Sequence, residues 1–126
     1  MPRRKGNILA VISSAAAAKL RRLAIFPDIY CHHITIAAHP DDVTYRKYAR
    51  LLGRRVRFQV TGVYADSKGQ AARVTGVPSE NAHPHITISC APGVHPKYSN
   101  DLLAKKRLPG KRYRQRGWAT VTLTRP

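Results

Sequence analysis

The phrase His33-Ile34-Thr35-Ile36 returns 52 positions later as His85-Ile86-Thr87-Ile88. Each copy alternates polar and aliphatic residues, which predicts a β-strand with one buried face. Successive side chains of a strand point to opposite faces, so the histidine and threonine of each copy share one face and the isoleucines share the other. Two such strands facing each other would form a small cleft that contains two imidazoles and two hydroxyls.

The composition describes a small, strongly basic protein. Its 126 residues suffice for one domain, and a hydrophobic content of 43% suits a folded core. The chain has 23 Lys and Arg residues and 6 Asp and Glu residues, which gives a net charge of +17. Residues 1–27 and 102–126 contain no acidic residue. Such an excess predicts affinity for a polyanion, most simply RNA or DNA, although a merely solvated basic surface is the alternative.

Two cysteines give no sign of a disulfide framework. Strand alternation places Cys31 on the histidine face of its strand and Cys90 on the isoleucine face of its own. We therefore expect no bridge between them and a reducing, intracellular (cytoplasmic) compartment.

The N-terminal segment partly resembles a targeting peptide, with a basic start at 3–5, an apolar run at 8–12 and small residues at 15–18. The apolar run is short, and no stretch reaches the length of a transmembrane helix. We favour a strand and a helix that belong to the fold, and we expect no membrane partner.

Periodicity and turn residues predict the order of elements along the chain. The expected elements are a strand over 7–12, a helix over 15–23 capped by Ser13 or Ser14, a motif strand over 29–38, a helix from Asp41 or Asp42 to 52, a hairpin of strands over 55–65 and 70–77, a second motif strand over 85–91, a helix over 100–106 capped by Ser99, a basic segment over 112–116 and a closing strand over 118–124.

This order predicts a single α+β domain over residues 1–126. Each motif strand is followed by a turn and a helix, so the chain reads as two pseudo-repeats, about 7–65 and 66–124.

The paired motifs resemble those of the 2H phosphoesterase superfamily. The fuller phrases, residues 30–36 (YCHHITI) and 85–89 (HITIS), are most similar to the cyclic-phosphodiesterase modules of RNA-repair and tRNA-ligase proteins. The resemblance implies a bilobal fold, with two pseudo-symmetric antiparallel sheets, flanking helices and the four motif side chains facing each other.

The residue types suit phosphodiester hydrolysis by themselves. One imidazole can accept a proton from water while the other, protonated, donates to the departing oxygen. Threonine hydroxyls can donate to the non-bridging oxygens as charge develops. We predict His33, Thr35, His85 and Thr87 as the catalytic residues, with no metal or cofactor, and either histidine can take either role.

Four other residues are candidates for substrate binding. Lys97 and Ser99 follow the second motif strand and could reach a phosphate, while Tyr30 and Tyr64 could stack on a base. Their structural alternatives are a solvated lysine, a helix cap and ordinary packing.

A metal site is the rival interpretation of the histidines. The potential ligands around the motifs are His32, His33, His39, His83, His85, His95, Cys31 and Cys90. Their spacings match no zinc signature, and carboxylates are few, so we predict no metal.

The sequence thus predicts a phosphodiesterase that opens 2′,3′-cyclic phosphates at RNA ends or on related nucleotides. One alternative is a phosphodiesterase that degrades cyclic oligonucleotide signals. Another is a non-catalytic RNA-binding subunit of a ribonucleoprotein. The sequence names no protein partner.

Overall fold

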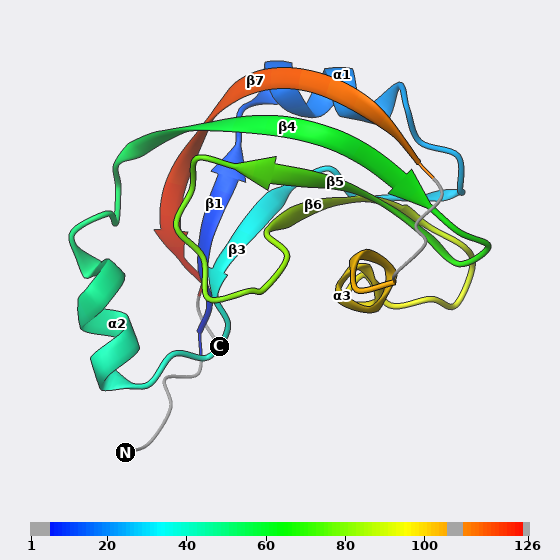
Figure 1. Cartoon of the computed structure of the whole chain (residues 1–126). Helices are drawn as coiled ribbons and strands as arrows, with labels where there is room; N and C mark the ends of the chain where they lie inside the picture. The colour runs from blue at the N-terminus through cyan, green and yellow to red at the C-terminus, as the bar shows by residue number, and fades with distance from the viewer. Residues whose placement is uncertain (1–5, 106–109, 125–126) are drawn as a thin grey trace.

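The computed structural model describes residues 6–105 and 110–124, which form seven strands and three short helices (Figure 1). In chain order these are β1 (Ile8–Ile12), α1 (Ser14–Arg21), β2 (Asp28–Ile29), β3 (His33–Ala37), α2 (Asp42–Ala49), β4 (Arg55–Ala65), β5 (Gly69–Thr75), β6 (His85–Cys90), α3 (Tyr98–Leu103) and β7 (Gly110–Leu123). Within the described ranges, no helix has both the length and the apolar character needed to cross a membrane.

The strands form one antiparallel sheet that closes on itself. Its order is β2-β6-β3-β1-β7-β4-β5, and an additional pairing of β5 with β6 completes a ring of six strands. Long β4 and β7 arch over one side of this ring, as Figure 1 shows. The predicted α+β class is confirmed. The expected division into two separate sheets is corrected, because the β3–β6 and β5–β6 hydrogen bonds join all strands.

The inward face of the ring holds the main core. Ile34 and Ile36 of the first motif and Ile86 and Ile88 of the second are fully buried there, as the alternation predicts. The same core cluster includes residues from every strand of the ring and from α1 and α2. Burial of aliphatic side chains is the main favourable term in folding, so the motif isoleucines anchor both site strands.

Two of the expected helix caps are present. The side chain of Ser13 accepts a hydrogen bond from the amide of Ala16, and that of Asp41 accepts one from Thr44. Each bond satisfies an amide that has no partner within its own helix.

The first motif strand is not continuous, contrary to expectation. Cys31 has φ 52°, a left-handed conformation that interrupts the strand between β2 and β3. The amide of Cys31 donates to Thr87, yet Ile34 pairs with Ile86, so two extra residues bulge out of the first strand.

This bulge also corrects the predicted orientation of Cys31. Its side chain is buried, not on the histidine face, and its thiol donates to the carbonyl of Ile88 at 3.6 Å. Burial raises the pKa of the Cys31 thiol to about 11, although the charge of Arg21 opposes the shift. Cys31 and Cys90 are both buried free thiols.

The C-terminal elements differ from the prediction in their bounds. Helix α3 starts at Tyr98, so Ser99 lies inside the helix and is not its cap, and the cap position, Lys97, makes no capping hydrogen bond. Strand β7 starts at Gly110, because it pairs with β4 along most of its length, and it includes the basic segment 112–116. The basic residues at 3–5, 106–107 and 125 lie outside the described residues.

We predict that Ile86→Ala lowers the free energy of unfolding by about 2–5 kcal/mol, because it leaves a cavity where β3 and β6 meet. Urea unfolding followed by circular dichroism measures the change. Val43→Ala is the control, since Val43 is 64% exposed and its truncation should change stability by less than about 0.5 kcal/mol. Equal, small effects of both substitutions would contradict the closed core.

Candidate active site

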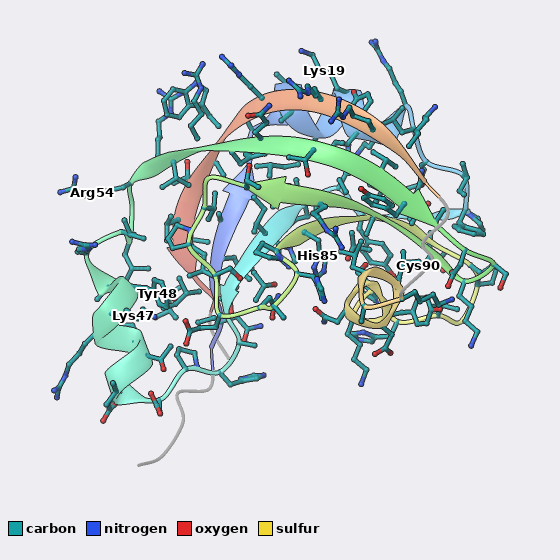
Figure 2. The ribbon with its side chains drawn as sticks, in the orientation of Figure 1. Lys19, Lys47, Tyr48, Arg54, His85 and Cys90 are labelled. Atoms are coloured by element: carbon teal, nitrogen blue, oxygen red, sulfur yellow. The ribbon has the colours of Figure 1, made fainter. Side chains whose placement is uncertain are left out.

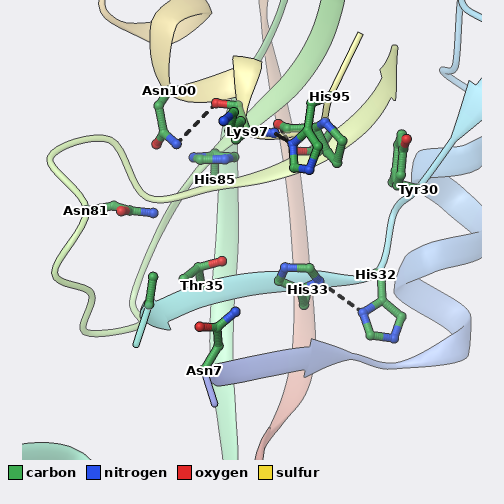
Figure 3. A pocket seen from close by; sticks show the side chains of 13 residues that line it. Asn7, Tyr30, His32, His33, Thr35, Asn81, His85, His95, Lys97 and Asn100 are labelled. Atoms are coloured by element: carbon green, nitrogen blue, oxygen red, sulfur yellow. Dashed lines mark hydrogen bonds between the residues drawn. The ribbon is translucent and has the colours of Figure 1, made fainter. Parts of the chain in front are cut away.

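A cleft of about 500 Å³ opens on the outer side of β3 and β6, and all four motif side chains line it (Figure 3). The remaining walls come from the residue before β1, from the segments on either side of β3, from the loops on either side of β6 and from α3. The lining residues are Asn7, Tyr30, His32, His33, Thr35, Ala38, Asn81, His85, Thr87, His95, Pro96, Lys97 and Asn100.

The register between the two motif strands explains this grouping. Ile34 lies directly opposite Ile86, and both point into the core. Because opposite residues of an antiparallel pair share a face and neighbours alternate, the flanking histidine and threonine of each strand point outwards together. The same alternation that buries the isoleucines therefore builds the cleft.

His85 is held in a fixed orientation. It is only 9% exposed, and its Nδ1 lies 2.7 Å from the carbonyl oxygen of His83. A carbonyl can only accept, so Nδ1 carries the proton and Nε2 is left for a ligand. Burial lowers the pKa of His85, the hydrogen bond to the carbonyl opposes this, and the nearby His83 ring lowers the pKa further.

His33 contacts a second imidazole. Its Nδ1 lies 3.0 Å from Nδ1 of His32, so one ring donates and the other accepts. Burial lowers the pKa of His33 to about 4, and the neighbouring His32 and His85 lower it in the same direction. At neutral pH the free protein therefore holds a neutral His33.

The two threonines have different surroundings. The hydroxyl of Thr87 lies 2.8 Å from the hydroxyl of Ser99 and 3.3 Å from the carbonyl oxygen of Pro96. The side chain of Thr35, in the part of the chain that the structure describes, forms no hydrogen bond, so its hydroxyl is open to the cleft. Thr87 is thus pre-positioned by α3, whereas Thr35 is not.

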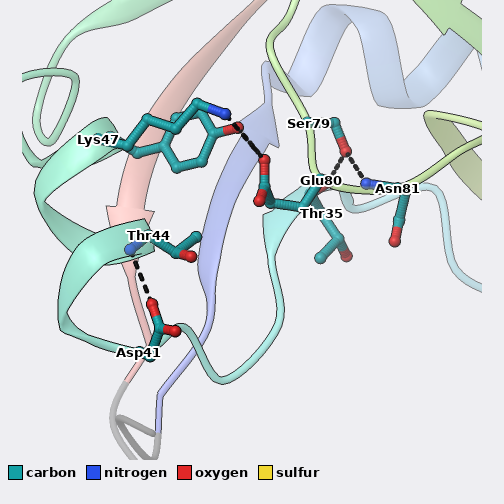
Figure 4. Close-up of polar contacts among 8 residues, drawn as sticks. Thr35, Asp41, Thr44, Lys47, Ser79, Glu80 and Asn81 are labelled. Atoms are coloured by element: carbon teal, nitrogen blue, oxygen red, sulfur yellow. Dashed lines mark hydrogen bonds and ion pairs between the residues drawn. The ribbon is translucent and has the colours of Figure 1, made fainter. Parts of the chain in front are cut away.

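A polar loop after β5 completes the cleft (Figure 4). The hydroxyl of Ser79 donates to the carbonyl of Thr35 and accepts from the amide of Asn81, at 2.8 and 3.0 Å. The carboxylate of Glu80 accepts hydrogen bonds from Tyr48 and Lys47 of α2. These contacts tie the loop to both β3 and α2, so Asn81 lies at the edge of the cleft.

The structure separates the four predicted substrate-binding residues. Tyr30 and Lys97 line the cleft. Ser99 is 2% exposed and reaches the cleft only through Thr87. Tyr64 lies elsewhere, where it lines a second pocket and packs against the small core beneath α3.

Three asparagines at the cleft, Asn7, Asn81 and Asn100, were not predicted. Each comes from a different segment, and none belongs to a local pattern that a single sequence reveals. Only the closure of the ring and the anchoring of the loops bring them to the motif strands.

No Asp or Glu is among the described residues that line the cleft. Within residues 6–105 and 110–124, no three His, Cys, Asp or Glu side chains are grouped as metal ligands. The rival interpretation as a metal site therefore gains no support from the arrangement of these side chains.

Paired imidazoles, hydroxyls and a lysine define a cleft suited to an anionic ligand such as a phosphate ester. A comparison with protein-family models agrees with this class: the model of the fungal tRNA ligase phosphodiesterase domain matches residues 28–125. The chain belongs to this family, which supports a phosphodiesterase that acts on RNA ends. A search of curated proteins found no match.

The family match includes both motifs but begins after β1 and α1. Strand β1 nevertheless supports the site, since it pairs with both β3 and β7 in the ring.

We predict that neutral His85 is the Nδ1-protonated tautomer, because Nδ1 donates to the His83 carbonyl. Long-range ¹H–¹⁵N correlation NMR at about pH 7.5 distinguishes the tautomers, and the spectrum of His85→Gln assigns the signal. Predominance of the Nε2-protonated form would contradict the orientation described.

Proposed function

We propose that the protein is a metal-independent phosphodiesterase that hydrolyses 2′,3′-cyclic phosphates at RNA ends, with His33 and His85 as its acid–base pair. The observation that carries this proposal is the convergence of two histidines and two threonines from distant segments on one cleft. Membership of a tRNA ligase phosphodiesterase family supports the same chemistry.

In the proposed reaction, water attacks the phosphorus of the cyclic diester. One histidine takes the proton of the water as the new P–O bond forms. The other histidine gives its proton to the 2′ or 3′ oxygen as the bond from phosphorus to that oxygen breaks. The product is a phosphomonoester with a free neighbouring hydroxyl, and the two histidines have exchanged protonation states.

The contacts of the two rings favour different roles. The carbonyl of His83 stabilises a proton on His85, while His32 disfavours charge on His33. We therefore assign His85 as the acid and His33 as the base. The negative charge of a bound phosphate would stabilise the protonated His85 further.

The threonine hydroxyls and Lys97 are placed to stabilise the negative charge of the phosphate. Thr35 and Lys97 can donate to its non-bridging oxygens without breaking an existing side-chain hydrogen bond of the described structure. Thr87 has one hydroxyl proton, which it donates to the carbonyl oxygen of Pro96, so it can donate to the phosphate only by exchanging that hydrogen bond. A hydrogen bond accepted from Ser99 would keep the Thr87 oxygen in place during this exchange, which makes Ser99 a positioning residue. Tyr30 at the cleft wall would stack on the terminal base.

We predict that His33→Ala and His85→Ala each lower kcat/KM by about 10²–10⁴-fold, the range usual for loss of a general acid or base. The assay follows hydrolysis of mononucleoside 2′,3′-cyclic phosphates and of RNA with a cyclic phosphate end, in the presence of EDTA.

His39→Asn is the matched control, because His39 does not line the cleft and its left-handed conformation, φ 45°, suits asparagine. Activity that disappears with EDTA, or that survives either cleft substitution, would refute the proposal. The same assay with cyclic oligonucleotides tests the alternative substrate class.

We also predict that kcat/KM has a bell-shaped dependence on pH, with its maximum at acidic pH. The active form has one neutral and one protonated ring, so it is most abundant between the pKa of His33, about 4, and that of His85, which lies below the ordinary 6.5. The value of kcat/KM should therefore peak between these limits and fall as pH rises to 8, because His85 loses its proton.

Initial rates between about pH 4 and 9 check this prediction, with circular dichroism at each pH to verify folding. The basic limb of kcat should lie at higher pH than that of kcat/KM, since bound phosphate raises the pKa of the acid. A kcat/KM that still rises through pH 8 would contradict the assigned roles.

A further inference from the structure

Strand β7 carries a line of cations on its outward face. Gln115, Ala119 and Val121 are buried, whereas the alternate residues are exposed. Among these exposed residues are Arg112, Arg114, Arg116 and Trp118, followed by Thr120 and Thr122. Alternate residues of a strand repeat every ~6.8 Å, so the first four side chains follow one another along the curved outer face of β7.

Two arginines of the neighbouring strand extend this row sideways. Arg57 pairs with Trp118, and the guanidinium groups of Arg55 and Arg57 lie 4.4 and 5.2 Å from the centre of the indole ring. Trp118 nevertheless remains 40% exposed, which is unusual for so large an apolar side chain. We call these six residues the arginine face: Arg55, Arg57, Arg112, Arg114, Arg116 and Trp118.

No carboxylate balances the arginine face. Neither β4 nor β7 contains Asp or Glu, and all six acids of the chain belong to other segments. The ion pairs among the described residues, Lys47–Glu80 and Lys105–Asp66, use none of its arginines. Five like charges on one surface repel each other and oppose folding, so a bound polyanion would relieve this repulsion.

The arginine face lies away from the cleft. In the ring order β6-β3-β1-β7-β4-β5, the β7–β4 pair is separated from the β6–β3 pair by β1 on one side and by β5 on the other. In Figure 2, long side chains with nitrogen tips extend outwards on the side of the molecule where β4, β7 and α1 lie, while His85 is on the other side of β5 and β6. A ligand of this face is therefore distinct from a phosphate in the cleft.

We propose that the arginine face is a second binding site, one for single-stranded RNA. Guanidinium groups bind phosphates through paired hydrogen bonds, and a row of them along one strand can follow an extended backbone. The indole, with arginines already over it, offers a surface on which an unpaired base stacks. A double helix fits less well, because its bases are stacked internally. The site would hold the body of an RNA, not its reacting end.

The test measures how tightly the intact protein binds a fluorescent single-stranded RNA of about 20 nucleotides. This RNA ends in a 3′-hydroxyl, so it is not a substrate of the proposed reaction. Anisotropy titrations over a range of salt concentrations give Kd and its salt dependence.

Arg114→Gln with Arg116→Gln should weaken binding and reduce the slope of log K against log salt by about 1.4, or ~0.7 per lost phosphate contact. The matched control is the double variant Arg46→Gln and Arg50→Gln. It removes two exposed arginines, one within α2 and one at its C-terminal end, and should leave this slope unchanged.

Trp118→Ala should weaken binding about 5- to 100-fold with little change in the salt slope, because stacking releases no counterions. Trp118→Phe keeps an aromatic surface and should retain most of the affinity, which distinguishes lost stacking from impaired folding. Loss of affinity in Trp118→Phe equal to that in Trp118→Ala would argue against stacking.

Two further results separate this site from the cleft. All arginine-face variants should hydrolyse a mononucleoside cyclic phosphate at the unmodified rate, and His85→Ala should bind the RNA normally. RNA binding that is unchanged in the arginine and tryptophan variants would overturn the proposal, whether or not the protein is a phosphodiesterase. Equal competition by a polyglutamate peptide of matched charge would also overturn it, and would indicate an acidic protein as the partner.

Discussion

The pairing of Ile34 with Ile86 is the contact on which the site depends. It is the one register pair between β3 and β6 in the described chain, and both side chains are fully buried. A slip by one residue would turn the histidines and threonines into the core and the isoleucines into water. Hydrophobic burial therefore selects the register, and the register brings the catalytic candidates together. The chemistry of the cleft is a consequence of how the core closes.

Burial changes the proton affinity of both cleft histidines. His85 and His33 are partly removed from water, which lowers the pKa of both imidazoles. Their unlike partners, a carbonyl for one and an imidazole for the other, then make two chemically identical side chains inequivalent. Acid–base catalysis by a histidine pair requires such a difference. In this protein it arises from residues outside the repeated motif.

The polar residues of the six-stranded ring lie on two surfaces of different chemistry. The cleft contains largely neutral groups that can exchange protons, and Lys97 is the cation among the described residues that line it. The β4–β7 surface contains an exposed indole and permanently charged arginines, which can bind anions but do not transfer protons. Under the two proposals, such a division lets affinity for RNA and reactivity towards its end be tuned independently.

Local patterns in the sequence determined the strand character of both motifs, the inward isoleucines and the outward histidines and threonines, since alternation is a property of neighbouring residues. The tertiary structure alone decided the rest. The left-handed turn at Cys31, the contact of Ser99 with Thr87 and the hydrogen bond from Ser79 to the carbonyl of Thr35 depend on contacts between different segments of the chain. Register, ring closure and loop anchoring are set by such non-local hydrogen bonds and packing, which no local periodicity encodes.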